Sequence, residues 1–310
     1  MTLPIEFVTT QPPMYYFNKY HIPIASEAIA TLHGEMKRIK CKWSSCDPPL
    51  FSQISIETYN RCNNDCSFCP ANRNFDKRKP VHMKEEMFSK IISELKQLDF
   101  GGTVALHINN EPLLDPRLPH FVSETRNLLP DVGISIWTNG ILLDESMLDE
   151  LYQHGLCGNA VLLVDDYSYD MRMSPNLSEL VEKIHGTQIE RDLRIIVWIR
   201  DKNARLTRRA GNAPNRRGQN MSKVEEKMIL RRWCSYPFTQ LNVNPSGLVH
   251  VCCNDVYYEN IVGDLSKESL LEVWRGERLR RIREELDNNG RRNINPCRNC
   301  DTINSWGIRS

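Results

Sequence analysis

The sequence Cys62-Asn-Asn-Asp-Cys66-Ser-Phe-Cys69 places three thiols within one short segment. It directly follows Gln53–Thr58, in which residues alternate as they do in a β-strand. We therefore expect the three cysteines in a loop at the C-terminal end of a strand. Three thiolates at this spacing can hold an iron–sulfur cube and leave one iron without a protein ligand. A zinc site completed by His82, or three packed core cysteines, are the alternatives.

A regular alternation of helices and strands continues beyond this loop. Met83–Leu98 has apolar residues at helical spacing, and Thr103–Ile108 follows it as a strand. The same patterns predict helices at Leu118–Leu129, Asp144–Gly155 and Leu177–Ile184, and strands at Ile134–Trp137, Ala160–Val164 and Leu193–Ile199. This alternation implies an α/β fold with a parallel sheet, in which the loops after the strand ends carry the chemistry. The pattern leaves open whether the five strands form an open sheet or a partial barrel.

Three further segments flank this core, which we place at residues 51–200. Residues 1–50 show no clean period and are expected to form an irregular lead-in. Residues 201–233 are predicted to be a basic linker or loop, because Arg200–Arg232 contains eleven Lys or Arg against three acids and is broken by glycine and proline. Residues 234–310 are predicted to form a second, smaller module.

The second module carries four more cysteines at defined spacing: Cys234, Cys252, Cys297 and Cys300. A predicted hairpin around Pro245–Gly247 and two predicted helices, Ser269–Trp274 and Glu277–Leu286, connect them. Four thiolates can close an iron–sulfur cluster completely, which suits electron transfer or the organisation of the module. A structural zinc ribbon is the alternative.

The composition is that of a globular protein of 310 residues, with 40% hydrophobic residues and a formal net charge of +1. So small a charge argues against a nucleic-acid binder, so a small molecule or peptide is the expected partner. No apolar stretch approaches the about 20 residues that cross a bilayer, and the first residues lack the pattern of a secretory signal. We therefore expect a cytoplasmic protein without a membrane partner, whose eleven cysteines favour metal ligation over disulfides.

The first cysteine segment resembles the signature of the radical S-adenosylmethionine (SAM) superfamily, CxxxCxφC, with Phe68 at the aromatic position. The resemblance implies that Cys62, Cys66 and Cys69 bind a [4Fe–4S] cluster and that SAM binds its open iron. It also implies that Phe68 packs near the adenine of SAM.

Two later segments resemble SAM-binding motifs of the same superfamily. Asn109-Asn110-Glu111-Pro-Leu-Leu is similar to the GGEPLL segment, with both glycines replaced by asparagine. This similarity implies that Asn110 and Glu111 bind the amino group of SAM. Thr138-Asn139-Gly is similar to the (S/T)NG turn, whose polar side chains face the ribose hydroxyls.

The resemblance also implies a fold and a further contact. A partial (β/α) barrel is expected for about residues 50–200, on the evidence of the resemblance and not of the spacing alone. Arg200, at the end of the fifth predicted strand, is a candidate partner for the SAM carboxylate. A solvated arginine is the alternative.

The C-terminal module resembles the SPASM or twitch extension found behind many radical SAM domains. The shared features are the spacing from Cys234 to Gly247 to Cys252 and the terminal Cys-x-x-Cys. The resemblance implies one auxiliary [4Fe–4S] cluster held by the four cysteines of this module.

These resemblances together imply an enzyme that cleaves SAM to a 5′-deoxyadenosyl radical and takes a hydrogen atom from a sugar, cyclitol or peptide. In a dehydrogenase, the substrate radical then loses a proton to a base and an electron to the auxiliary cluster. The base candidates by position are Asp165, Asp166 and Asp255, each of which could equally be a solvated loop acid. In an epimerase, Cys253 would return a hydrogen atom; a ligand or a packed thiol is the alternative, because free cysteine is often simply buried.

Two other functions stay open. The chain could be a peptide-maturing or partner-activating radical SAM enzyme, with the basic segment Arg200–Arg232 holding an acidic leader peptide. A non-catalytic iron–sulfur or zinc binding module would bind metal and leave SAM intact. For the enzyme, a reductase such as flavodoxin or ferredoxin is the expected protein partner.

Overall fold

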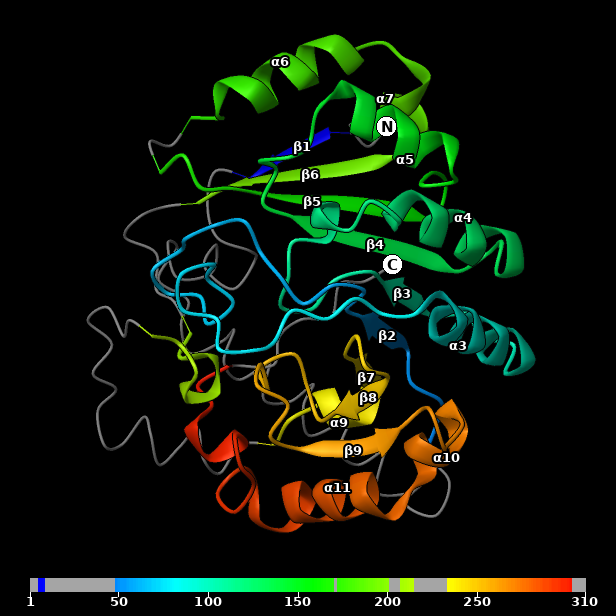
Figure 1. The fold of residues 1–310 in the computed structure, drawn as a ribbon, viewed down its shortest axis with the longest axis vertical. Coiled ribbons are helices and arrows are strands. Elements are labelled where there is room, and N and C mark those ends of the chain that lie inside the picture. Colours follow the sequence, from blue (N-terminus) through cyan, green and yellow to red (C-terminus); the bar gives the residue numbers. More distant parts are fainter. Residues whose placement is uncertain (1–4, 9–47, 170–171, 201–206, 215–232, 303–310) are drawn as a thin grey trace, which may run out of the picture.

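The computed structural model describes residues 5–8, 48–169, 172–200, 207–214 and 233–302. Within these residues, the strands form one sheet in the order β1-β6-β5-β4-β3-β2-β7-β8-β9 (Figure 1). They are β1 (Ile5–Val8), β2 (Gln53–Ile56), β3 (Thr103–Ala105), β4 (Gly133–Thr138), β5 (Ala160–Asp166), β6 (Arg194–Ile199), β7 (Gln240–Val243), β8 (Leu248–His250) and β9 (Ile261–Asp264). Every neighbouring pair from β1 to β7 is parallel, and β8 and β9 continue the sheet in antiparallel fashion.

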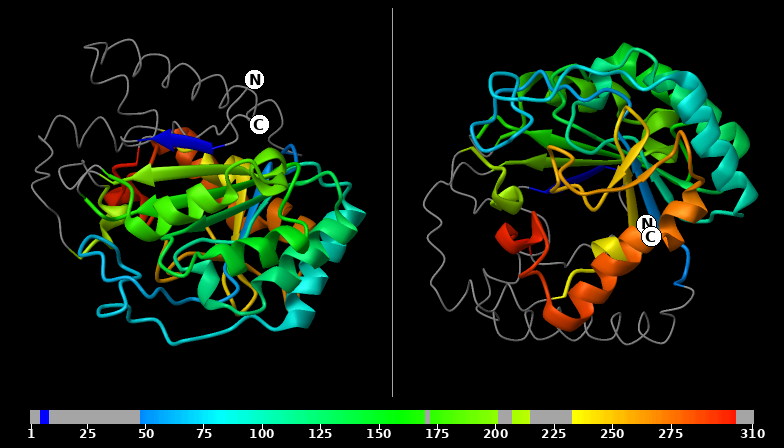
Figure 2. Two further views of the ribbon diagram at one scale, coloured as in Figure 1. Left: turned by 90° about the horizontal axis from the view of Figure 1, so that it is seen from above. Right: turned by 60° about the horizontal axis from the view of Figure 1, so that its bottom comes forward.

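Helices cover one face of the parallel strands. The described helices are α3 (Glu85–Gln97), α4 (Leu118–Leu128), α5 (Glu145–Gln153), α6 (Pro175–Ile184), α7 (Gln188–Asp192), α9 (Tyr236–Thr239), α10 (Leu270–Arg275) and α11 (Glu277–Asn289), with 3-10 turns η1 (Pro112–Leu114), η2 (Arg209–Gly211) and η3 (Cys297–Asn299). Neighbouring helices from α3 to α6 contact one another, and Figure 2 shows them as one layer against the sheet. None of the helices in the described parts of the chain has the length and apolar character that crossing a bilayer requires.

The main core lies between this helix layer and the sheet. Strand side chains alternate between the two faces, and the following ones are buried in the core cluster that includes the helices: Ile54, Ile56, Val104, Ile134, Ile136, Leu162, Val164, Ile195 and Val197. The other face carries a smaller cluster, in which the rings of Trp137 and Trp198 lie 4.8 Å apart.

The five predicted core strands are all present. Since β1 and β9 end the strand order, the sheet stays open and the barrel is partial.

Two strands were not predicted. β1 lies in the segment expected to be an irregular lead-in, yet it pairs in parallel with β6. β9 pairs with β8 and widens the predicted hairpin. The rest of the lead-in, residues 1–4 and 9–47, lies outside the described residues, as do 201–206 and 215–232 of the predicted basic linker.

The C-terminal module continues the sheet of the core. β7 pairs in parallel with β2, and Trp274 of α10 packs on Phe51 with ring centroids 5.3 Å apart. The hairpin turn contains Gly247 at a φ of +78°, where a Cβ atom would lie 2.7 Å from the Cε of Met87 in α3. The two predicted modules therefore share one sheet and one core.

Candidate active site and four-cysteine cavity

The loop between β2 and α3 carries Cys62, Cys66 and Cys69, so the triplet follows a strand as predicted. The loop folds back on itself. The Cys69 N–H donates to the Cys66 carbonyl at 3.0 Å, and Asn72 Nδ2 donates to the same carbonyl at 2.8 Å. His82, the proposed fourth ligand of a zinc site, instead stacks on Tyr59 with centroids 3.8 Å apart.

The surroundings of these thiols disfavour their ionised form when no metal is bound. Burial raises the pKa of Cys62 to about 11, and Glu111 and Cys69 add to the effect. Burial also raises the pKa of Cys66 to about 12, together with the charges of the other two cysteines. Iron is bound by the thiolate form, so a positively charged iron–sulfur core would offset this penalty. The donor set therefore fits a cluster with one open iron.

Glu111 joins the ends of β3 and β4. Its side chain is buried, with 1% of the residue exposed. Oε1 accepts hydrogen bonds from the Leu113 N–H at 3.0 Å and the Thr138 hydroxyl at 2.7 Å, and Oε2 accepts from the Asn139 N–H at 2.7 Å. Burial raises the pKa of Glu111 to about 7 against the effect of these hydrogen bonds.

Asn139 connects this junction to the cysteine loop. Its Nδ2 donates to Asn63 Oδ1 at 2.8 Å and to Cys62 Sγ at 3.7 Å. The three segments singled out from the sequence, which are the cysteine loop, Glu111 and the Thr138–Asn139 turn, therefore meet at the C-terminal edge of the parallel strands.

A charged and aromatic group follows β5 and β6. The ring of Phe68 lies 6.0 Å from that of Tyr167, whose hydroxyl donates to Asp165 Oδ2 at 3.1 Å. Arg200 forms an ion pair with Asp165, with Nη2 and Oδ1 2.5 Å apart and only 19% of the arginine side chain exposed. Burial alone would lower the pKa of Arg200, but Asp165 and Tyr167 raise it further than burial lowers it. The alternative of a solvated arginine is therefore wrong.

The other two base candidates hold turns. Both carboxylate oxygens of Asp166 accept backbone N–H groups, at 2.9 and 2.6 Å. Those of Asp255 do the same, both at 2.9 Å, and burial raises the pKa of Asp255. Asp165 differs from them, because its hydrogen-bond and ion-pair partners in the described residues are the side chains of Tyr167 and Arg200.

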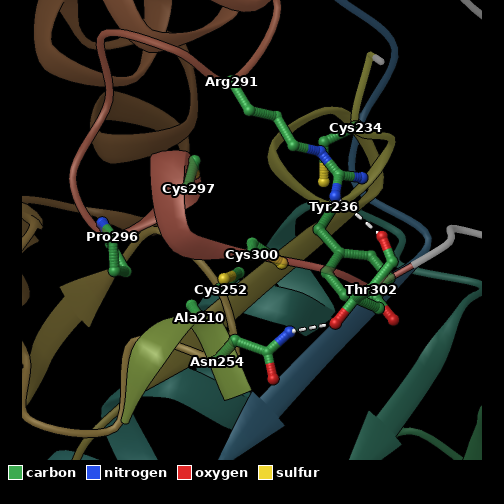
Figure 3. A pocket seen from close by; sticks show the side chains of 10 residues that line it. All are labelled: Ala210, Cys234, Tyr236, Cys252, Asn254, Arg291, Pro296, Cys297, Cys300 and Thr302. Carbon is green, nitrogen blue, oxygen red and sulfur yellow. Dashed lines mark hydrogen bonds between the residues drawn. The ribbon is translucent and has the colours of Figure 1, made fainter. Parts of the chain in front are cut away.

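The four cysteines of the C-terminal module line one cavity (Figure 3). Cys234 precedes α9, Cys252 follows β8, and Cys297 and Cys300 begin and follow η3. Burial and the neighbouring thiols raise the pKa of Cys252 and Cys297. No three Cys, His, Asp or Glu side chains in the described residues group closely enough for a single metal ion. Four thiols that line one cavity can close an iron–sulfur cluster completely.

A family model of the radical SAM superfamily matches residues 56–226, which is more than half of the chain. The chain belongs to the radical SAM superfamily. A second model, described as an iron–sulfur cluster-binding domain and named SPASM, matches residues 234–301. The protein is therefore a radical SAM enzyme with a [4Fe–4S] cluster, SAM and SPASM-type auxiliary iron–sulfur binding.

Individual relatives are also similar to this radical SAM enzyme. It is 26% identical over 258 residues to the S-adenosyl-L-methionine-dependent 2-deoxy-scyllo-inosamine dehydrogenase of Niallia circulans, covering 82% of this chain and 94% of that protein. The structure of BtrN in complex with AdoMet and 2-DOIA matches with a TM-score of 0.68 and 23% identity, covering 83% of this chain and 95% of that one. The PqqA peptide cyclase of Granulibacter bethesdensis is 28% identical over 114 residues, 36% of this chain and 28% of that protein.

Cys253 of this radical SAM enzyme lies in a turn. β8 ends at His250, so Cys253 lies beyond the end of the strand. Cys252 lines the four-cysteine cavity, and Cys253 is not among the described residues that do. Burial raises the pKa of Cys253, and the nearby guanidinium of Arg209 opposes that rise.

Asn109, which stands where the family motif has glycine, connects the two cysteine regions of the enzyme. Its Nδ2 donates to the Cys253 carbonyl at 2.8 Å, and its Oδ1 accepts from Arg209 Nη2. Its N–H donates to Glu57 Oε1 at 3.2 Å, and its carbonyl accepts from Arg78 Nη2 at 2.7 Å. Every polar group of Asn109 is therefore engaged.

A buried charged network continues this connection. Arg78 Nη1 lies 3.0 Å from Glu57 Oε1 and donates to the Tyr258 hydroxyl at 2.9 Å, and Tyr258 in turn donates to Glu57. Sequence analysis singled out neither this network nor Arg209 and Arg291. Motif spacing gives no signal for such residues, although the asparagine at position 109 marked where Arg209 and this network meet.

Proposed function

We propose that this radical SAM enzyme oxidises a secondary alcohol of a cyclitol or sugar to a ketone. The observation that carries the proposal is the closed set of four thiols behind the SAM motifs. A cluster with no open iron is suited to accepting an electron and not to binding substrate. The similarity to a cyclitol dehydrogenase over 94% of that protein supports this choice, whereas the similarity to a peptide cyclase is local. By their names, the first of these relatives acts on a small molecule and the second on a peptide.

The proposed division of labour follows the two modules. SAM and its cluster, when bound, would supply the 5′-deoxyadenosyl radical for removal of a hydrogen atom from the alcohol carbon, and the auxiliary cluster would be the acceptor for the electron that oxidation releases. We assign residues 51–200 to the first role and 234–310 to the second. Cys62, Cys66 and Cys69 are the proposed ligands of the first cluster, and Cys234, Cys252, Cys297 and Cys300 those of the second.

Side chains at the sheet edge would hold SAM. Phe68 is partly exposed and is proposed to cover the adenine. Asn110 has a buried Nδ2 atom for which the structure gives no partner, so this amide is available to a ligand. Glu111 is proposed to meet the amino group, and its hydrogen bonds hold the Thr138–Asn139 turn, which is proposed to face the ribose. Arg200 would meet the SAM carboxylate only while also paired with Asp165.

The proton released from the alcohol needs an acceptor at the same edge. We propose Asp165, because Asp166 and Asp255 use both oxygens to hold turns. Asp165 lies at the end of β5 with 7% of the residue exposed, and the Arg200 ion pair and the Tyr167 hydroxyl fix its orientation.

We also propose that an acidic one-electron carrier such as flavodoxin or ferredoxin docks on the cysteine loop. The segment from Arg73 to Lys79 exposes Phe75 at 56%, and Lys77 and Lys79 are exposed beside it. Exposed apolar and basic groups together suit an acidic partner. A cytoplasmic location would keep the proposed thiol ligands reduced.

The experiment that tests the dehydrogenase uses the anaerobically reconstituted enzyme with SAM, a reductant and 2-deoxy-scyllo-inosamine as the first probe. We expect 5′-deoxyadenosine and a product two mass units lighter than the substrate. The same reaction in D2O separates the alternatives, because deuterium at an inverted carbon would indicate epimerisation through a thiol such as Cys253. A Cys62→Ala, Cys66→Ala, Cys69→Ala variant should form neither product. SAM left intact by the cluster-loaded wild type would contradict the proposal.

A further inference from the structure

A buried arginine lies in the wall of the four-cysteine cavity. Arg291 is 1% exposed, and it lines the cavity together with Cys234, Cys297 and Cys300. Figure 3 shows its guanidinium extending toward Cys234 and Thr302. Nη1 donates to the Thr302 carbonyl at 2.7 Å, and Nη2 donates to the Trp233 carbonyl at 3.4 Å. These two bonds fix the orientation of the guanidinium.

The guanidinium of Arg291 and the four cysteines line the same cavity, so the charge of Arg291 lies beside the place of the proposed cluster. An arginine keeps its charge even when buried, and a buried charge is little screened by solvent. The position of Arg291 therefore gives the cavity a permanent positive charge on one side.

A cluster held by four thiolates is negatively charged, and it becomes more negative when it accepts an electron. A fixed positive charge in the cavity wall stabilises the reduced cluster more than the oxidised one. Net charge and hydrogen bonding are the means by which proteins set the potentials of such clusters. We propose that Arg291 raises the reduction potential of the auxiliary cluster, which makes it a better electron acceptor.

The consequence for turnover rests on the proposed function. After loss of a hydrogen atom, the substrate carbon carries an unpaired electron beside its hydroxyl. Formation of the C=O bond then breaks the O–H bond, sends the proton to a base and sends one electron to the oxidised auxiliary cluster. Arg291 touches neither SAM nor substrate in this scheme, so it is a positioning residue that acts through the cluster.

The potential is measured on the auxiliary cluster alone. The Cys62→Ala, Cys66→Ala, Cys69→Ala background removes the first cluster, so redox titration followed by electron paramagnetic resonance reports one species. In that background we expect Arg291→Gln to lower the midpoint potential. At the wild-type midpoint, the ratio of reduced to oxidised cluster should fall about tenfold, which equals about 59 mV for one electron. Arg291→Lys, which keeps the charge, should recover most of the shift.

Arg283 supplies the matched control. It is also a buried arginine of the same module, and it donates to the carbonyls of Pro237 and Trp274 at 2.8 Å, but it is not among the described residues that line the cavity. Arg283→Gln should therefore weaken folding without moving the potential. A shift as large in Arg283→Gln as in Arg291→Gln would overturn the proposal.

Other outcomes also decide the matter. An unchanged potential in Arg291→Gln, or an equal shift in Arg291→Lys, would show that charge is not the cause and would overturn the inference.

Arg291→Met provides a second neutral variant of similar length. If both neutral variants fail to bind iron while Arg291→Lys binds it, Arg291 retains the cluster and does not tune it, which again overturns the inference. The titration needs no substrate, so a shift without any alcohol oxidation would refute the proposed function alone.

Discussion

Glu111 is the residue on which the geometry of the SAM motifs depends. One buried carboxylate holds the Thr138 hydroxyl and the Asn139 N–H, and Asn139 in turn contacts the cysteine loop. Since burial raises its pKa to about 7, its protonation changes within the range in which the enzyme can be studied.

Replacing Glu111 by Gln should therefore remove a pH dependence of stability. The pKa is raised above its ordinary value of 4.5, so the folded state holds a proton that the unfolded state releases. This stabilisation is complete below pH 4.5 and is lost as the pH rises through 7. As the pH rises from 5.5 to 8, the free energy of unfolding of the wild type should fall by about 2 kcal/mol more than that of Glu111→Gln. Denaturant unfolding at each pH without SAM measures both values. Parallel stability curves for the two proteins would contradict the raised pKa.

Asn109 offers a second test at the residue scale. Asn109→Gly restores the family glycine, but it removes the bonds to the Cys253 carbonyl and to Arg209. We expect a loss of about 1–3 kcal/mol in unfolding free energy and fewer products per 5′-deoxyadenosine, because the two cysteine regions are less firmly joined. Asn110→Gly is the control for the unfolding free energy, since its Oδ1 accepts only from the nearby Ile108 N–H among the bonds of the described residues. Equal losses of unfolding free energy in both variants would show that Asn109 has no connecting role.

Residues brought together by neighbouring strand ends could be predicted, and residues that reach across the molecule could not. Glu111, Thr138 and Asn139 each follow a predicted strand, and parallel strands place such positions at one edge. Arg291 approaches the cysteines from beyond α11, and Arg209 approaches Asn109 from η2. Their contacts depend on how the elements pack, for which the sequence contains no short pattern.

At the scale of elements, the alternating pattern predicted the core strands, and two short strands escaped it. β1 has four residues, and its pairing with the distant β6 gives it no local signal. β9 contains Gly263, a residue that is unfavourable in strands. The fold explains this glycine, because a Cβ atom there would lie 2.3 Å from a methyl group of Val273.

The contact between the C-terminal hairpin and α3 can be tested through Gly247. Gly247→Ala combines a positive φ with a Cβ atom 2.7 Å from the Cε of Met87. The backbone effect alone costs about 1–2 kcal/mol, and displacement of Met87 adds to it. Gly158→Ala is the control, because its φ is +63° and no atom lies within 4 Å of the added Cβ. Thermal unfolding should show a larger decrease for Gly247→Ala, and equal decreases would show that the hairpin tolerates the crowding.

At the scale of the whole molecule, the pairing of β2 with β7 makes the two modules one folding unit. A chain truncated after residue 233 would expose the edge of β2 and would lose the packing of Trp274 on Phe51. Open strand edges promote aggregation, so we expect the truncated chain to be insoluble or aggregated when analysed by size-exclusion chromatography. A monomeric truncated protein that still binds one four-iron cluster would contradict this expectation.

The shared sheet also bears on how such enzymes diversify. Where two domains meet through an exposed patch, recombination can exchange one of them and keep the other. Here a boundary between the two modules would cut the pairing of β2 with β7 inside the sheet. It would also cut the hydrogen bonds of Asn109 and Tyr258. Another SPASM module could be grafted onto this core only if it offered a matching strand edge. The substrate range of the enzyme is therefore expected to change by amino-acid substitution more readily than by exchange of modules.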